Sequence, residues 1–197
     1  MDYRKEYEKW LASPALSEEE RNELKAIAND EKEIENRFYG PLEFGTAGLR
    51  GTMYVGLHNM NRHVIRWATQ GFANVIRAEG AAAMQKGVAI CMDCRVNSMA
   101  FARAAAEVCA ANGIRVRIFE SLRPTPELSF AVREYGCTAG INVTASHNPK
   151  EYNGYKVYWS DGAQLPPQHA AAIAKELEHI DIFTGVTSMD FDEAVNK

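Results

Sequence analysis

The chain is 197 residues long, 46% of them hydrophobic, and it carries a formal net charge of -4 at pH 7. That length is enough to bury one sizeable core, and it favours one domain over two. The acidic balance excludes the dominant basic face with which nucleic-acid binders neutralise phosphates, so we expect no nucleic-acid partner. An anionic ligand must then be held by a local cluster of cations.

The sequence contains neither a membrane span nor a secretion signal. Its longest apolar stretches, residues 87–92 and 140–143, are too short to cross a bilayer, and the N-terminus is charged. The 4 cysteines lack the spaced framework of small secreted domains. We therefore expect a soluble, cytoplasmic protein with no membrane partner.

The first 41 residues predict a charged helical arm. Residues 3–11 form one expected helix and residues 17–39 another, which starts with a capping box that pairs Ser17 with Glu20. Gly40 and Pro41 end it. We assign no chemistry to this arm and expect it to pack against the domain that follows, residues 42–197.

Beyond the arm, strands and helices alternate. This pattern predicts a three-layer α/β/α fold with a mixed, mostly parallel sheet. The expected helices cover residues 61–80, 98–111, 126–135 and 168–179, and the expected strands cover 88–92, 114–119 and 138–143, with a hairpin at 155–165. Ligands of such sheets bind beyond the carboxyl ends of the strands, where residues 93–97, 123–126 and 144–154 are expected.

The most informative segment is TASHNPKEYNGYK, residues 144–156, on the loop between the third strand and the hairpin. A serine in such a loop can carry a phosphoryl group if donors and cations surround it. His147, Lys150 and Lys156 supply them close to Ser146. In the alternative interpretation, Ser146 only shapes a turn beside Asn148 and His147 only braces the loop.

Two other segments carry arginines. The glycine-rich segment FGTAGLRG, residues 44–51, is expected to be a flexible loop, with Arg50 as a planar donor fork. Arg95 follows the first strand of the alternating run, where a local ion pair with Asp93 is an equally good interpretation. Arg123 and Thr125 are interpreted as scaffold at the start of a helix.

TASHNP, with a lysine ten positions after its serine, resembles the phosphoserine signature of the α-D-phosphohexomutases (phosphoglucomutase/phosphomannomutase). The resemblance extends from about residue 42 to 177, and GTAGLRG is similar to the phosphoglucomutase/phosphopentomutase branch. It implies that Ser146 is phosphorylated and that His147 and Lys156 are catalytic, with Lys156 the better candidate for general acid or base. It also implies that Arg50, Thr46 and Arg95 bind substrate or phosphate.

The resemblance further implies a reaction and its cofactors. A phosphosugar mutase of this family moves phosphate within glucose or mannose phosphates through a sugar bisphosphate, which is also the activator. Mg²⁺ is held by the phosphate on Ser146 and by aspartates of an Asp-Gly-Asp-x-Asp-Arg loop. That loop does not occur in this sequence. We therefore expect one domain of a longer polypeptide, which packs against the later domains and has little activity alone.

Three alternatives remain open. The substrate is a pentose phosphate if the chain belongs to a phosphopentomutase, and a non-catalytic binding module would keep the fold without the reaction. Cys91 and Cys94 form a Cys-x-x-Cys at a strand end, as in thioredoxin-like redox pairs, although they lie partly inside the strand. A zinc site is disfavoured because the sequence has no second Cys-x-x-Cys pair.

Overall fold

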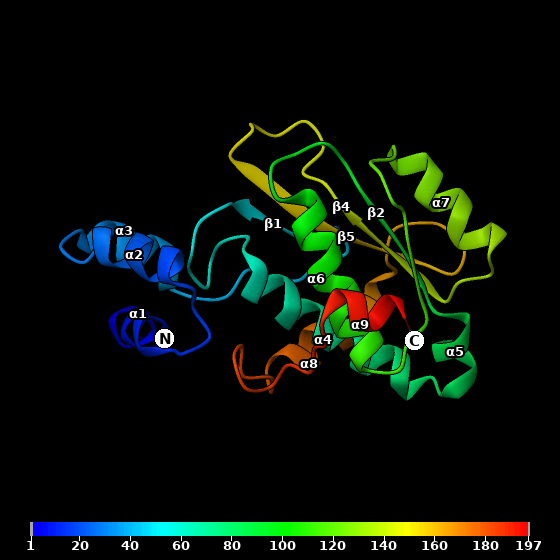
Figure 1. Cartoon of the computed structure of the whole chain (residues 1–197), viewed down its shortest axis with the longest axis horizontal. Helices are drawn as coiled ribbons and strands as arrows, with labels where there is room; N and C mark the ends of the chain where they lie inside the picture. The colour runs from blue at the N-terminus through cyan, green and yellow to red at the C-terminus, as the bar shows by residue number, and fades with distance from the viewer. Residues whose placement is uncertain (1, 197) are drawn as a thin grey trace.

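The computed structural model describes residues 2–196, which form nine helices and five strands (Figure 1). The strands are β1 (Leu49–Thr52), β2 (Val88–Met92), β3 (Val116–Ile118), β4 (Ala139–Val143) and β5 (Tyr152–Trp159). The helices are α1 (Tyr3–Ala12), α2 (Glu18–Ala26), α3 (Glu31–Phe38), α4 (Arg62–Ala78), α5 (Ala81–Lys86), α6 (Ser98–Ala111), α7 (Thr125–Glu134), α8 (Pro167–Leu177) and α9 (Phe191–Val195).

The five strands form one mixed sheet in the order β1-β5-β4-β2-β3. β2 pairs in parallel with β3 and β4, whereas β5 is antiparallel to both β4 and β1. Four strands therefore share one direction, and β5 runs against them. Figure 1 shows α4 and α8 on the opposite side of the strands from α7. The predicted three-layer α/β/α fold is confirmed.

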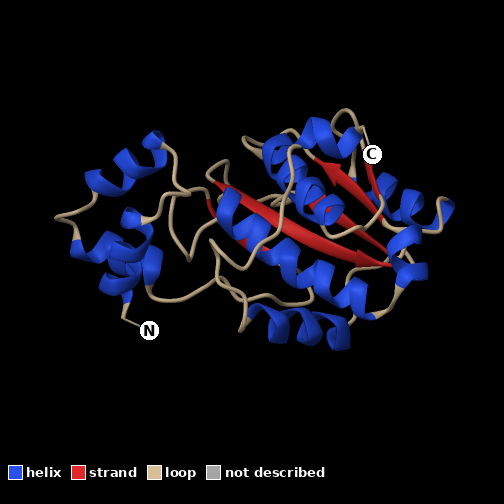
Figure 2. Ribbon diagram, turned by 60° about the horizontal axis from the view of Figure 1, so that its bottom comes forward, coloured by secondary structure: helices blue, strands red, loops and turns tan. Residues whose placement is uncertain are grey.

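The helical arm shares its core with the rest of the molecule. Trp10 of α1 is fully buried, and its ring packs edge-on against Phe38 of α3 and Phe183 near the C-terminus, with centroids 5.7 and 5.0 Å apart. Lys9 and Asp181 add an ion pair of 2.8 Å. Figure 2 shows the three arm helices grouped beyond one end of the sheet.

The single helix expected over residues 17–39 is wrong, because the chain forms α2 and α3 instead. The capping box of Ser17 and Glu20 is present at the start of α2. The helix stops at Ile27, and Asp30 caps a new one by accepting a hydrogen bond from the backbone N–H of Glu33. A short acidic side chain that caps a backbone N–H outcompetes helix continuation at this point.

Two further expectations are corrected at the sheet. Residues 49–51 of the expected flexible loop belong to strand β1, whose Leu49 faces Tyr155 of β5 and is buried. The expected hairpin is present only in part: residues 163–165 fold back on β5 through a bridge between Gln164 and Tyr158 and two backbone hydrogen bonds, but they form no strand of their own. β5 begins three residues earlier than expected, at Tyr152, and pairs along its length with β4 and β1.

The structure also contains two short helices, α5 and α9, that the sequence pattern did not predict. Among residues 2–196, no helix combines the length and the apolar character that crossing a bilayer requires. α9 and the segment before it lie along α6, as Figure 1 shows at the red end of the chain.

The close approach of β1 to β5 generates a stability prediction. Gly48 has a φ of +74°, and a Cβ there would overlap the carbonyl oxygen of Tyr155. We expect Gly48→Ala to lower the free energy of unfolding by at least about 3 kcal/mol. Gly136 also has a positive φ but open space, so Gly136→Ala is expected to cost about 1 kcal/mol.

Urea unfolding followed by circular dichroism measures these differences. The control is Gly40→Ala, because Gly40 has open space around it and is not among the positive-φ residues. A Gly48→Ala protein as stable as Gly40→Ala would contradict the close approach of β1 and β5.

Candidate functional site

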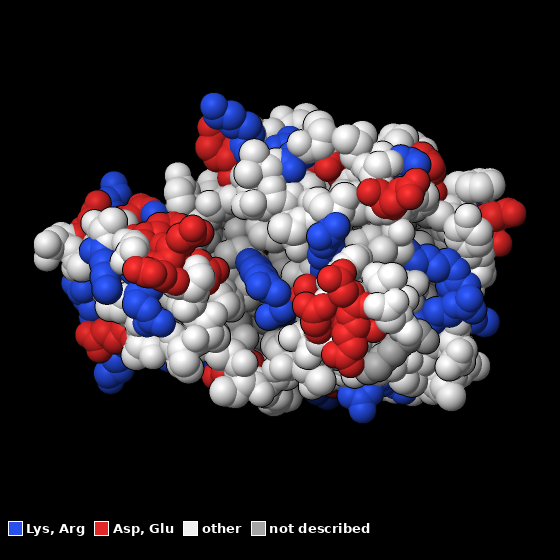
Figure 3. Space-filling model, in the orientation of Figure 1, with Lys and Arg blue, Asp and Glu red and all other residues white. Residues whose placement is uncertain are grey.

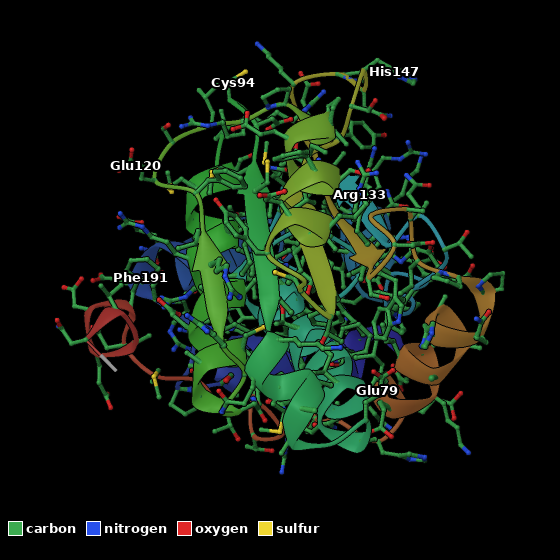
Figure 4. All side chains as sticks on the ribbon, turned by 90° about the vertical axis from the view of Figure 1, so that its right-hand side faces the viewer. Glu79, Cys94, Glu120, Arg133, His147 and Phe191 are labelled. Carbon is green, nitrogen blue, oxygen red and sulfur yellow. The ribbon has the colours of Figure 1, made fainter. Side chains whose placement is uncertain are left out.

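The loops that follow the parallel strands meet at one edge of the sheet. β1, β2, β3 and β4 end at this edge, and β5 starts there, because it returns antiparallel directly after β4. Figure 4 shows His147, Cys94 and Glu120, which belong to three of these loops, at the same end of the molecule. Glu79 lies at the opposite end. The predicted gathering of residues 93–97 and 144–154 at this edge is present.

Ser146 is an exposed residue at this edge of the sheet. β4 and the next two residues are buried, whereas Ser146 and His147 are exposed. Ser146 has a φ of +58°, which is uncommon for a residue other than glycine. Its backbone N–H donates to Oγ1 of Thr144 at 3.0 Å, and its Oγ lies 3.4 Å from Nδ1 of His147. The serine hydroxyl is thus presented to solvent beside an imidazole.

Arg50 and Lys156 share one face of the sheet near this loop. Arg50 lies opposite Gly154 in the β1–β5 register, and Lys156 is two residues further along β5. Side chains alternate between faces along a strand, so these two cations lie on the same face. Nη1 of Arg50 donates to Oδ1 of Asn148 at 3.1 Å. The structure therefore joins the glycine-rich segment to the serine loop.

Asn142 of β4 lies directly opposite Lys156. Its side chain donates to Oγ1 of Thr125 at 2.8 Å, at the start of α7, while its Oδ1 has no hydrogen-bond partner. Asn142 is 1% exposed. Asn142 therefore places a buried polar side chain on the same face of the sheet as Lys156.

The remaining predicted residues occupy different positions. Thr46 is exposed in the turn that connects Gly45 with Gly48, and its hydroxyl has no hydrogen-bond partner among the described residues. Arg95 lies under the serine loop, and its guanidinium donates to backbone carbonyls of that loop. The guanidinium of Arg123 donates to its own loop and to Glu127 in α7. We therefore keep Arg123 as scaffold.

Three polar residues that support the site were missed at the sequence level. Asn148 binds both Arg50 and Arg95, while Asn153 and Ser98 form a buried pair in which Asn153 Nδ2 donates to Oγ of Ser98 at 3.0 Å. Asn148 and Asn153 both lie within the TASHNPKEYNGYK segment. Both signals are visible in the sequence, but the partners are not.

A large hollow lies elsewhere in the described part of the chain. It has a volume of about 720 Å³ and separates α2 from α4 and α6, and no residue of the 144–151 loop lines it. Figure 3 shows basic side chains along the hollow between the arm and the rest of the molecule. Two of the lining residues, Arg62 and Arg66, share one oxygen of Glu107. Their partner is already within the protein, so we assign the site to the loop edge.

The Cys-x-x-Cys pair does not show the chemistry of a redox site. Cys91 is buried in β2, and burial raises the pKa of its thiol to about 11, whereas Cys94 is exposed. A reactive thiol needs a lowered pKa, so Cys91 has the opposite character. Among residues 2–196, no three His, Cys, Asp or Glu side chains gather as metal ligands.

The model of one protein family matches most of this chain. It is described as phosphoglucomutase/phosphomannomutase, alpha/beta/alpha domain I, and it matches residues 41–182. Phosphopentomutase from Homo sapiens is 42% identical over 159 residues, which are 77% of this chain and 26% of that protein. Phosphoglucomutase from Staphylococcus saprophyticus is 39% identical over 165 residues, or 84% and 29% of the two chains.

Solved structures agree with these matches. A phosphoglucomutase/phosphomannomutase family protein from Burkholderia thailandensis has a TM-score of 0.57 and 26% identity, and covers 69% of this chain and 30% of its own. The phosphoglucomutase parafusin from Paramecium has a TM-score of 0.64 at 24% identity, covering 78% and 28%, which supports the fold. The chain spans 25% to 29% of the curated relatives it matches.

The different environments of the cysteines predict their reactivity. We expect a thiol reagent at mildly alkaline pH to modify Cys94 alone in the folded protein, because Cys91 and Cys109 are buried with pKa values raised to about 11 and about 12. Reagent uptake measured by mass spectrometry tests this. Cys94→Ala should abolish the fast reaction, and Cys137→Ala, which removes a buried thiol, serves as its control. A disulfide between Cys91 and Cys94 after mild oxidation would revive the redox interpretation.

Proposed function

This chain belongs to the phosphoglucomutase/phosphomannomutase family, and we propose that it supplies the phosphoserine domain of a phosphosugar mutase. One observation carries the proposal: the serine of TASHNP is exposed, at the edge where the strands end, on a loop whose backbone is hydrogen-bonded to Thr144 and Arg95. Arg50, His147 and Lys156 come to that edge from three places in the sequence. An exposed serine near several cations is a suitable carrier for a dianionic phosphoryl group.

The proposed reaction transfers the phosphoryl group of Ser146 to a free hydroxyl of the bound sugar phosphate. The P–O bond to Ser146 Oγ breaks, a P–O bond to the sugar oxygen forms, and a base takes the hydroxyl proton. Return of the other phosphate from the sugar bisphosphate to Ser146 regenerates the enzyme. The net reaction moves phosphate within the sugar and leaves the protein unchanged.

Lys156 is the proposed general acid or base, since its ammonium has no hydrogen-bond partner among residues 2–196. His147 is the proposed donor to the seryl oxygen, from which its Nδ1 lies 3.4 Å. Nη1 of Arg50 donates to Asn148, and the other N–H groups of the guanidinium are proposed to bind phosphate. Thr46 is retained as a proposed substrate contact, supported by its exposure alone.

Mg²⁺ fits this loop only in part. The described residues near Ser146 are mainly cationic, so the chain offers the ion the phosphoserine oxygen and no carboxylate cluster. When bound, the ion neutralises charge on the transferring oxygens. The other ligands are proposed to belong to later domains, which pack against this one in a longer polypeptide. A cytoplasmic location is proposed because all four cysteines are free thiols, as is usual in a reducing compartment.

Two sugar classes remain proposed substrates. Phosphopentomutase and phosphoglucomutase relatives match this chain with nearly equal identity, 42% and 40%. We propose glucose or mannose phosphates first, with ribose phosphates as the second candidate. Assays of the natural-length protein with glucose 1-phosphate and with ribose 1-phosphate separate these classes.

The phosphoserine proposal predicts a mass difference. Protein of natural length, purified after incubation with glucose 1,6-bisphosphate and Mg²⁺, is expected to gain one phosphoryl group, whereas Ser146→Ala gains none. The matched control is Ser160→Ala, which removes another exposed serine, from the turn after β5, and keeps the phosphoryl group. Intact-mass measurement decides. A phosphoryl group retained on Ser146→Ala would refute the assignment.

The short span of the chain predicts low activity for residues 1–197 alone. Because the chain covers 29% or less of its curated relatives, most of a mutase active site is expected to lie outside it. We expect mutase turnover at background with either sugar 1-phosphate, measured by a coupled assay. Turnover comparable to that of a natural-length relative would show that these residues suffice.

A further inference from the structure

The guanidinium of Arg95 makes its polar contacts with other groups of the protein. Its side chain is 13% exposed, and its Nε lies 3.4 Å from Oδ2 of Asp93. Its two terminal nitrogens donate to four backbone carbonyls within the loop between β4 and the start of β5. These carbonyls belong to Ser146 at 2.9 Å, Asn148 at 2.6 Å, Pro149 at 2.9 Å and Tyr152 at 3.0 Å.

These hydrogen bonds stabilise the unusual backbone conformation of Ser146. Its φ of +58° is disfavoured for a residue with a side chain, so surrounding contacts must hold it. Its N–H is bonded to Thr144, and its carbonyl is bonded to Arg95. Both polar backbone groups of the serine are therefore held, and its side chain is left exposed.

A second set of contacts holds Arg95 itself. Oδ1 of Asp93 accepts from the backbone N–H of Arg95 at 2.9 Å and from the hydroxyl of Ser98 at 2.7 Å. Ser98 in turn accepts from Asn153 of β5, and both of these residues are buried. The first turn of α6 and the strand β5 are thus connected to the same guanidinium. Its charge is already paired with Asp93.

We propose that Arg95 is a positioning residue that holds Ser146 in its left-handed conformation, and that it does not itself bind the phosphate. All four N–H groups of the terminal nitrogens are hydrogen-bonded, and Nε faces the carboxylate of Asp93, so the guanidinium has no donor directed at a ligand. Lysine cannot replace it, because one ammonium has three donors at a single point. The positioning role is independent of the proposed function, and only its effect on phosphoryl transfer from Ser146 rests on that function.

Hydrogen exchange of the purified chain tests this inference directly. We expect the amides of residues 144–152 to exchange at least about tenfold faster in both Arg95→Ala and Arg95→Lys than in the unsubstituted protein. Added ethylguanidinium should restore protection to Arg95→Ala. The matched control is Arg123→Ala, which removes an arginine at the neighbouring loop and is expected to leave residues 144–152 unchanged.

Several outcomes would overturn the proposal. Unchanged loop exchange in Arg95→Ala refutes the positioning role. In the natural-length protein, Arg95→Ala could instead raise the KM for the phosphosugar while kcat and the exchange rates of residues 144–152 stay unchanged. That result would show that Arg95 binds the phosphate. If Arg95→Ala does not fold, Asp93→Asn serves as the second variant, because it removes the negative charge that pairs with the guanidinium. The amides of residues 144–152 must then exchange faster in Asp93→Asn than in the unsubstituted protein. A wild-type protein that never carries phosphate refutes the proposed function but leaves the exchange result valid.

Discussion

The antiparallel return from β4 into β5 is the constraint on which the site depends. The chain leaves the sheet after Val143 and re-enters it at Tyr152, so the loop with Ser146 must lie at the edge where the parallel strands end. The same return sets the register that places Lys156 opposite Asn142. A shift of one residue in this register would move Lys156 to the opposite face, where Tyr155 now fills the core.

β1 completes the arrangement from a distant part of the sequence. Its pairing with β5 carries Arg50 onto the face of Lys156, and Gly48 permits the close contact because it has no side chain. Asn148 then connects Arg50 to the serine loop. The cations of the site therefore depend on backbone pairing more than on contacts with one another, which suits a rigid site for a charged ligand.

The helical arm and the loop edge have separate roles in the molecule. The arm contributes Trp10 and Phe38 to a core that it shares with α4 and the C-terminal segment, whereas the residues of the serine loop are mostly exposed. Burial thus stabilises one end of the molecule, and hydrogen bonds shape the other. Such a division is common where a rigid scaffold presents a functional loop. The domain presents its serine without relying on the large hollow beside the arm.

The sequence by itself determined the α/β/α fold, the position of most helices and strands, and the serine segment, because these depend on local periodicity, caps and short motifs. It did not determine the break between α2 and α3, where the Asp30 cap competes with helix continuation, or strand β1, whose hydrogen bonds come from β5. Only the tertiary structure decided that Arg95 bonds the serine loop and that Arg50 faces the side of Lys156. The hydrogen bonds of Arg95 to Ser146 and of Arg50 to Asn148 join residues 51 and 98 positions apart, and no local pattern encodes which of several nearby partners a long side chain will reach.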